Sequence, residues 1–214
     1  MSDPSHHPSS DRLLEHATGA LEIGRALVVS SHVGLCSKCR AEKAFAETVG
    51  GALLEHLPPA DLRPDALARS LARIEAAGPL APAATPLAAP AGWIEAPAEV
   101  VAAVARRRWA APGVWVAPVT RGPGGARSYL LRVGAGMSVP RHTHRGAEMV
   151  CILKGAFVDH GETFGPGDFA ESDDEVEHRP TITADGECVC VVAADSALIP
   201  LDWVGRLFQP LVGI

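Results

Sequence analysis

The apolar residues follow two different patterns along the chain, and the change from one to the other divides it. Up to residue 77 they recur three or four positions apart, which places them on one face of a helix. The stripes are Leu13, Leu14, Ala17; Leu21, Ile23, Leu27, Val28; Leu35, Cys36, Cys39, Ala44, Phe45, Thr48, Val49, Leu53; and Leu67, Leu71, Ile74. Pro58-Pro59 interrupts the pattern, and Pro64 suits the first turn of the last helix. We expect three or four helices in a small bundle, whose limited core a metal or a partner would help to stabilise.

The second part alternates short apolar runs with turn residues. Runs rich in Val, Ile and Leu cover residues 114–119, 129–133, 149–153 and 188–193. Glycine-containing turn sequences stand between them, at residues 122–125, 154–155, 160–161, 166–168 and 185–186. Many short strands at near-regular spacing are typical of an antiparallel sandwich or barrel, so we expect an all-β domain here.

An Ala/Pro-rich stretch joins the two parts. Residues 76–94 carry no charge but contain four prolines, which suits a semi-rigid linker better than a membrane-spanning helix. We therefore expect a helical domain at residues 1–77, a linker at 78–92, a β domain at 93–205 and a C-terminal tail at 206–214. Such a linker allows several placements of the two domains, so direct contact between them cannot be assumed.

Charge and cysteine content narrow the possible partners and the compartment. The 19 Lys and Arg against 25 Asp and Glu give a formal charge of −6, without the basic surface that a direct DNA or RNA binder usually shows. Five cysteines in 214 residues are too few and too uneven for a disulfide scaffold. The first residues lack the basic start and apolar core of a signal peptide. We expect a cytoplasmic protein that contacts neither nucleic acid nor a membrane.

The first candidate for a metal site is the cluster His32, Cys36 and Cys39. The two cysteines stand three apart, so at the start of a helix they share a face, and the helix N-terminus favours their thiolates. Zinc prefers four such sulfur and imidazole ligands, so a fourth must come from elsewhere. The adjacent histidines His6 and His7 are the natural candidates. Two other histidines, His16 and His56, are weaker ones.

Other interpretations of the cysteine pair remain. Cys36 and Cys39 could be small core residues, or a thioredoxin-like redox pair, although no βαβ pattern surrounds them. Among the remaining cysteines, Cys188 and Cys190 face the same way on an expected strand, and packing explains them better than redox chemistry. Cys151 is expected in the core.

The second candidate for a metal site lies in the β domain. His142 and His144 are two apart, so on a strand both point to one face, and Glu148 follows. Residues 136–155 resemble the first cupin motif, G-x5-H-x-H-x3-E-x6-G, at every named position. Residues 166–168 and then His178 resemble the second, with a shortened spacing and Arg179-Pro180 where that motif has asparagine. Three imidazoles and a carboxylate can hold Zn, Mn, Fe or Ni; the alternative is a metal-free cupin with buried, hydrogen-bonded histidines.

The His-x3-Cys-x2-Cys pattern in a small helical domain resembles the zinc-binding anti-sigma family. By that resemblance an upstream histidine, His7 or failing that His6, completes a zinc site with His32, Cys36 and Cys39. An Ala/Pro linker and a C-terminal cupin follow this domain, and the combination resembles ChrR-type anti-sigma factors. The resemblance places zinc in the cupin on His142, His144, Glu148 and His178. The resemblance implies two zinc ions, one per domain. It also implies binding of an extracytoplasmic-function sigma factor, which is kept from core RNA polymerase until an oxidant stress, notably singlet oxygen, acts through the cupin.

Three functions compete. The first is the anti-sigma factor, which needs no catalysis and would present apolar residues such as Leu13, Leu21, Leu27 and Phe45 to the sigma factor. The second is a metal-dependent cupin enzyme, such as a dioxygenase acting on a small diketone, which leaves the helical domain unexplained. The third is a structural module whose N-terminal site holds a dimer together.

Overall fold

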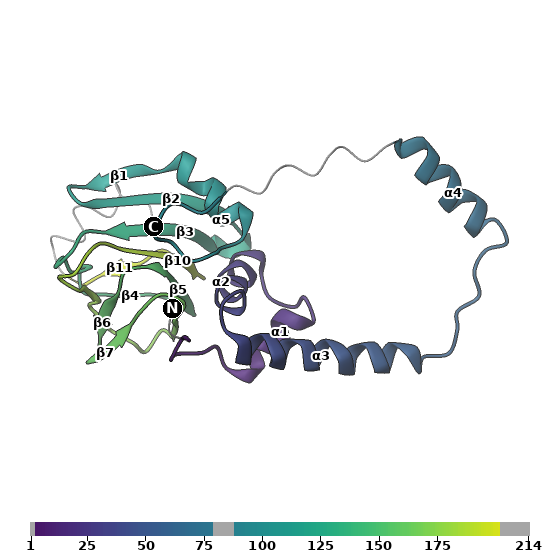
Figure 1. Ribbon diagram of the computed structural model, residues 1–214, viewed down its shortest axis with the longest axis horizontal. Helices are drawn as coiled ribbons and strands as arrows, with labels where there is room; N and C mark the ends of the chain where they lie inside the picture. Colours follow the sequence, from purple (N-terminus) through teal and green to yellow (C-terminus); the bar gives the residue numbers. More distant parts are fainter. Residues whose placement is uncertain (1–2, 79–87, 202–214) are drawn as a thin grey trace.

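One antiparallel sheet of six strands forms the centre of the molecule (Figure 1). The computed structural model describes residues 3–78 and 88–201; most of the expected linker and the whole expected tail at 206–214 lie outside them. The strands run in the order β1-β2-β3-β10-β5-β8. Their bounds are β1 Arg108–Ala111, β2 Val114–Arg121, β3 Arg127–Val133, β10 Cys188–Ala194, β5 Glu148–Lys154 and β8 Phe169–Ser172. The four strands expected from apolar runs are β2, β3, β5 and β10.

Five short strands lie over one face of this sheet. They are β6 Phe157–Asp159, β7 Glu162–Phe164 and β9 Thr181–Ile182, in the order β7-β6-β9, and the pair β4 His142–Thr143 with β11 Ile199–Pro200. The core between the layers contains Ile152, Phe157, Ile182, Cys190 and Val192. The antiparallel all-β domain is therefore confirmed as a cupin-type sandwich, and in the described part of the chain its sheets do not close into a barrel.

Helices precede the sheet in the chain. They are α1 Ser10–Ala17, α2 Ile23–Val33, α3 Ser37–Glu55, α4 Ala66–Ala77 and α5 Ala98–Ala103, followed by a short 3-10 turn, η1 Val104–Arg106. A second 3-10 turn, η2 Pro123–Gly125, lies between β2 and β3. Side chains cap the first three: Ser9 accepts from the Arg12 amide, Glu22 from the Gly24 amide and Cys36 from the Cys39 amide. None of the helices in the described residues is long and apolar enough to cross a bilayer.

Helix α2 lies on the outer face of the six-stranded sheet, so helices and sheet share one core. Val28 and Val29 of α2 are fully buried together with Leu130, Cys151 and Val191 of the sheet. Every residue of β10 is buried, because alternate side chains point into the sandwich and toward α2. The sequence left the placement of the two parts open, and the structure packs them directly against each other.

The expected small helical bundle forms only in part. Helices α1, α2 and the beginning of α3 pack together, whereas α4 buries no residue and stands apart from them (Figure 1). Helix α4 begins at Ala66 with Asp65 at its N-cap position, so Pro64 precedes the helix and does not stand in its first turn as expected. Of the apolar residues expected to face a partner, Leu13 is buried and Leu21 and Leu27 pack against the core, so only Phe45 is free.

Candidate metal centres

The N-terminal cluster forms where α2 ends and α3 begins. His32 is in the last turn of α2, Cys36 caps α3 and Cys39 lies in its first turn. Because Gly34 and Leu35 turn the chain sharply between the helices, all three side chains meet and are buried. His7 reaches them from the leader before α1, and the four ligand atoms lie within 4.8 Å of one another.

The distances within this cluster match those expected around a zinc ion. His32 Nε2 lies 3.2 Å from Cys39 Sγ, and His7 Nδ1 lies 3.4 Å from Cys36 Sγ and 3.5 Å from Cys39 Sγ. The two imidazole nitrogens are 3.4 Å apart. Ordinary Zn–S and Zn–N bonds at tetrahedral angles place N and S ligand atoms about 3.6 Å apart and two N atoms about 3.3 Å apart. The four side chains are therefore spaced within a few tenths of an ångström of what a tetrahedral zinc ion needs at the four distances given.

Hydrogen bonding and burial leave these ligand atoms in a state that favours binding of a cation. His32 Nδ1 lies 2.7 Å from the carbonyl oxygen of Gly167, which leaves Nε2 as the lone-pair nitrogen facing the cluster. Burial lowers the pKa of His32, so the ring is neutral at pH 7. Burial, and then hydrogen bonding to Cys36, raise the pKa of the Cys39 thiol to about 12, so a thiolate here requires a bound metal ion.

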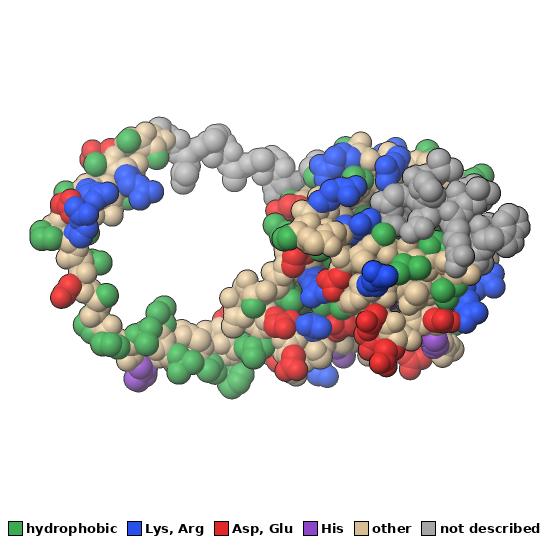
Figure 2. All heavy atoms as spheres, turned by 180° about the vertical axis from the view of Figure 1, so that it is seen from behind, with side chains coloured by type: hydrophobic (Ala, Val, Ile, Leu, Met, Phe, Trp, Pro, Cys, Tyr) green, Lys and Arg blue, Asp and Glu red, His purple; other side chains and the backbone are tan. Residues whose placement is uncertain are grey.

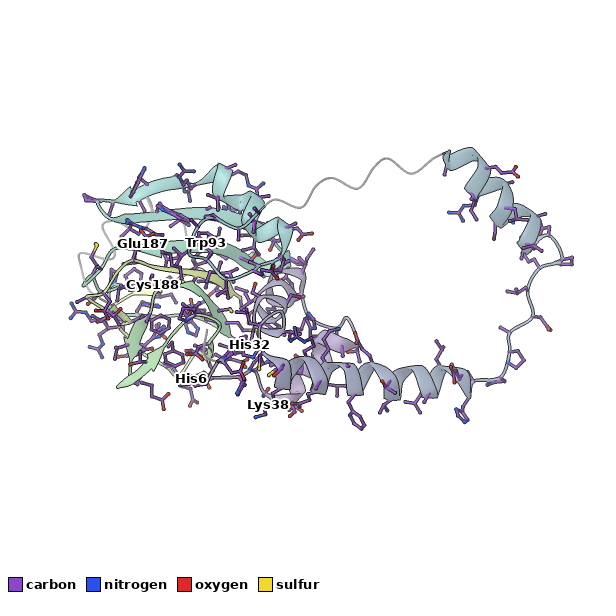
Figure 3. All side chains as sticks on the ribbon, viewed as in Figure 1. His6, His32, Lys38, Trp93, Glu187 and Cys188 are labelled. Carbon is purple, nitrogen blue, oxygen red and sulfur yellow. The ribbon has the colours of Figure 1, made fainter. Side chains whose placement is uncertain are left out.

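The structure distinguishes among the candidate fourth ligands. His7 enters the cluster, whereas His6 stacks on Phe164 with ring centroids 4.3 Å apart. His16 Nε2 is 2.8 Å from the Ser30 hydroxyl, and His56 Nδ1 bonds to the Ala52 carbonyl on the exposed end of α3. His6 and His32 come from the leader and α2 and lie beside the start of α3 (Figure 3).

The second cluster lies inside the sandwich. His142 is in β4, Glu148 begins β5 and His178 forms a bridge with His142. Their ligand atoms lie within 4.8 Å of one another and all three side chains are buried. His144 is buried just after β4 but is not within that distance of all three; its ring centroid is 5.9 Å from that of His178.

The three histidines expected as cupin ligands use the same ring nitrogen for hydrogen bonding. His142 Nδ1 is 2.8 Å from the Pro140 carbonyl and His144 Nδ1 is 2.9 Å from the Gly146 carbonyl. His178 Nδ1 is 2.9 Å from Asp159 Oδ2. The Nε2 atoms of His144 and His178 are buried without any hydrogen-bond partner. In metal-binding histidines one ring nitrogen is typically held by a hydrogen bond while the other is left without a hydrogen-bond partner to bind the metal, and these rings show that arrangement.

Burial and neighbouring charges shift the pKa values of two histidines of this cluster in opposite directions. Burial, and next the charge of His178, lower the pKa of His142 to about 4, so its imidazole is neutral. Burial acts to lower the pKa of His178, but the Asp159 hydrogen bond and the Glu148 charge outweigh it and raise that pKa. Asp159 was missed at the sequence level, because nothing in its spacing marks it as the partner of a histidine nineteen positions away.

An apolar cavity opens beside the second cluster. Leu131, Val133, Phe157 and Ile182 line it, and Cys188 and Cys190 contribute two buried free thiols. Burial raises the pKa of Cys188 to about 12, so these thiols are unreactive packing residues in this environment. Cys151 is buried in the core, as expected. His142, Glu148 and His178 of the second cluster also line this cavity.

Comparison with known proteins identifies the family. Residues 97–197 match the family described as ChrR Cupin-like domain. The anti-sigma-E factor ChrR of Cereibacter sphaeroides is 36% identical over 214 residues, which cover 98% of each chain. The chain belongs to the ChrR family of anti-sigma factors.

The match to ChrR extends to the three-dimensional structure. The crystal structure of Rhodobacter sphaeroides SigE in complex with the anti-sigma ChrR aligns with a TM-score of 0.74 and 34% identity. The alignment covers 89% of this chain and 99% of that chain. The ChrR-type resemblance and the cupin fold are thereby confirmed, and the family is one of regulatory proteins rather than enzymes.

Proposed function

We propose that this protein is a cytoplasmic anti-sigma factor that binds an extracytoplasmic-function sigma factor and keeps it from core RNA polymerase. The observation that carries the proposal is an exposed apolar surface on α3 and α4. Its residues, which we call the arch surface, are Phe45, Val49, Leu53, Leu54 and Leu57 around α3, and Leu67, Leu71 and Ile74 on α4.

The arch surface is too apolar to face water in the working protein. Phe45 is 70% exposed, Leu53 68% and Leu67 72%. Figure 2 shows hydrophobic side chains gathered along the arm formed by α3, whereas over α4 they stand among charged side chains. Residues 45, 49 and 53 recur every four positions, as do 67 and 71, so each helix presents one stripe. Stripes of this kind dock on an apolar protein partner.

The N-terminal metal site supports the same function by fixing the root of α3. Its proposed ligands His32, Cys36 and Cys39 belong to the end of α2 and the start of α3, and His7 belongs to the leader. A zinc ion there would supply a rigid tetrahedral link between elements that have little core of their own. The direction in which α3 projects toward the partner is then set by the metal.

The cupin is proposed as the part that responds. Its proposed ligands are His142, His144, Glu148 and His178, and a second zinc would raise the bound ions to two. The functional division we propose follows the expected ranges, with residues 1–77 binding the sigma factor and 93–205 sensing an oxidant such as singlet oxygen. Because α2 packs on the six-stranded sheet, a change in the sheet reaches the helices without crossing the linker.

Co-expression of the full chain with an extracytoplasmic-function sigma factor from the same organism tests the proposal. We expect a stable complex on gel filtration and inhibition of sigma-dependent transcription in vitro. The variant to compare is Leu67→Asp/Leu71→Asp, which alters only exposed residues of α4 and should therefore weaken the complex without weakening the fold. Failure of every such sigma factor of the organism to bind the wild-type chain would refute the function.

The cavity beside the second cluster favours one alternative, a metal-dependent dioxygenase acting on a small diketone. That function requires a redox-active metal, because zinc does not change oxidation state. Iron bound at the cupin site, with oxygen consumption on addition of acetylacetone, would support it. Zinc at that site and no oxygen consumption would exclude it.

A further inference from the structure

The turn between β7 and β8 of the cupin touches the N-terminal metal cluster from the side opposite the helices. The Gly167 carbonyl accepts from His32 Nδ1 at 2.7 Å. Gly167 has φ +91, and a Cβ at this position would lie 2.9 Å from Pro4 Cγ and 3.1 Å from Leu35 Cδ1. Only glycine brings the turn this close, so leader, helix junction and cupin are in van der Waals contact here.

The next residue of the turn, Asp168, binds the leader. Its Oδ1 accepts from the Ser5 amide at 2.6 Å and from the His6 amide at 3.0 Å, and its Oδ2 accepts from the Gly165 amide at 2.8 Å. The Phe169 amide donates to the His6 carbonyl at 3.1 Å. These bonds fix the leader backbone up to the residue that precedes His7.

Asp168 is well suited to this role because its carboxylate is enclosed. The residue is 5% exposed. Burial acts to raise its pKa, but the amide donors of Gly165, His6 and Ser5 outweigh burial and lower it, so the group is a charged acceptor at neutral pH. Amide bonds to a carboxylate are about twice as strong as neutral ones, and removing their acceptor leaves buried amides without a partner.

We propose that Asp168 is a positioning residue for the N-terminal metal site: a cupin side chain that holds the leader so that His7 reaches the metal. The inference rests on the metal site of the proposed function. His7 stands 25 positions before His32, and a free leader would lose much conformational entropy on supplying a ligand. Because the hydrogen bonds to Asp168 already order the leader, most of that conformational entropy is not lost again when His7 binds the metal. With the Gly167 carbonyl behind His32, the cupin turn orients both imidazoles of the cluster.

The test is the rate at which the full-length protein loses metal from the thiolate site. Cobalt(II) loaded in place of zinc gives a thiolate-to-metal absorption band only where cysteine is a ligand, so the band reports on Cys36 and Cys39. For Asp168→Ala we expect loss of the band to a chelator about tenfold to a hundredfold faster, the usual cost of removing a partner behind a metal ligand. The matched control is Asp173→Ala, whose carboxylate accepts a local amide from Glu175 and contacts no leader residue.

Two further variants separate positioning from general damage to the turn. Ser5→Pro removes the amide and hydroxyl donors of Ser5 to Asp168 without changing any residue of the cupin, and it should also speed metal loss. In a double-mutant cycle with His7→Ala, adding Asp168→Ala should cause no further acceleration, because Asp168 acts only through His7. Additive effects of the two substitutions, or wild-type rates in both Asp168→Ala and Ser5→Pro, would overturn the inference.

The outcome also distinguishes this inference from the metal site on which it rests. Absence of the thiolate band in the wild-type protein would refute the site itself. A wild-type band of full intensity, with unchanged release in the Asp168 variant, would refute only the role of Asp168. Circular dichroism melting of each variant shows whether the cupin sandwich is intact while the release rate is measured.

Discussion

Arg25 of α2 and Asp195, the residue after β10, form an ion pair between the helices and the cupin. The other carboxylate oxygen of Asp195 accepts from the Ala147 amide at 2.9 Å. Ala147 directly precedes Glu148, and the Gly146 carbonyl just before it orients His144. One carboxylate thus links α2 to the loop that carries two proposed cupin ligands.

Because Asp195 makes two of these contacts and Arg25 only one, we expect substitution of Asp195 to be the more damaging. Arg25→Ala removes a partly exposed ion pair and should lower the free energy of unfolding by no more than about 1 kcal/mol. Asp195→Ala also leaves the Ala147 amide without its acceptor, so it should cost more and loosen metal at the cupin site. Urea unfolding and chelator competition measure both effects. Equal effects of the two substitutions would show that the loop does not depend on Asp195.

Removing a cysteine of the N-terminal cluster should abolish inhibition. Cys39→Ala takes away one of four proposed ligands, and the helix junction then loses the metal free energy that fixes it. We expect about one metal equivalent less by elemental analysis and no sigma complex by pull-down. Cys151→Ala is the control, since Cys151 is equally buried but lies in the core outside both clusters. A Cys39 variant that still inhibits would contradict this role.

A charge on α4 should weaken the complex without weakening the fold. Leu71 is 51% exposed and α4 buries nothing, so Leu71→Asp should change the free energy of unfolding by less than about 0.5 kcal/mol. If Leu71 is an anchor in the interface, affinity should fall by about 2 kcal/mol or more, roughly 30-fold. Calorimetric titration with the sigma factor measures this. Trp109→Asp on β1, exposed by 66%, should leave affinity unchanged.

Substitutions in the cupin cluster should separate binding from response. His142→Ala and Glu148→Gln alter groups remote from the arch surface, so sigma binding should persist in a pull-down. Release under oxidant, followed with a sigma-dependent reporter, should weaken. Constitutive reporter activity in either variant would instead show that the cupin metal is needed to hold the inhibited state.

The ion pairs of Glu187 lead us to expect that the free energy of unfolding falls slightly in acid. Hydrogen bonds from Lys154 and then from Arg132, at 2.9 Å and 2.8 Å, lower its pKa. A carboxylate with a lowered folded-state pKa contributes stability above its unfolded pKa, near 4.5, and loses it as pH falls through the folded value. Glu187→Gln should therefore cost up to about 1 kcal/mol at pH 7 and nothing at pH 2. A cost that persists at pH 2, measured by chemical unfolding, would contradict the electrostatic origin.

Local spacing was sufficient to predict most residues of both clusters, whereas the metal ions that they would bind stay a prediction. Cys36 and Cys39 share a face because a helix starts between them, and His142 with Glu148 follows a motif whose ligands are close in sequence. The turn glycines and apolar runs likewise predicted β2, β3, β5 and β10. These features depend on neighbours in the chain, which is why a single sequence reveals them.

The remaining features depend on contacts between distant segments. That His7 and not His6 lies in the cluster depends on where the leader is held, and Asp168 binds its backbone just before His7 from 162 positions away in the chain. The burial of Leu13 follows from packing of the helices on the sheet, which no helical stripe can reveal. One signal was present: all seven residues of β10 are apolar, and a strand of that kind is covered on both faces.

Helices α3 and α4 carry the two stripes of the arch surface and are joined by residues 56–65. A partner that binds both stripes would be held by two contacts that the intervening chain links to each other. One proteolytic nick near Leu62, which is 81% exposed, would turn two linked contacts into independent ones and remove their high effective concentration. Escape of the captive protein could thus be triggered by a single peptide-bond hydrolysis that damages neither metal cluster.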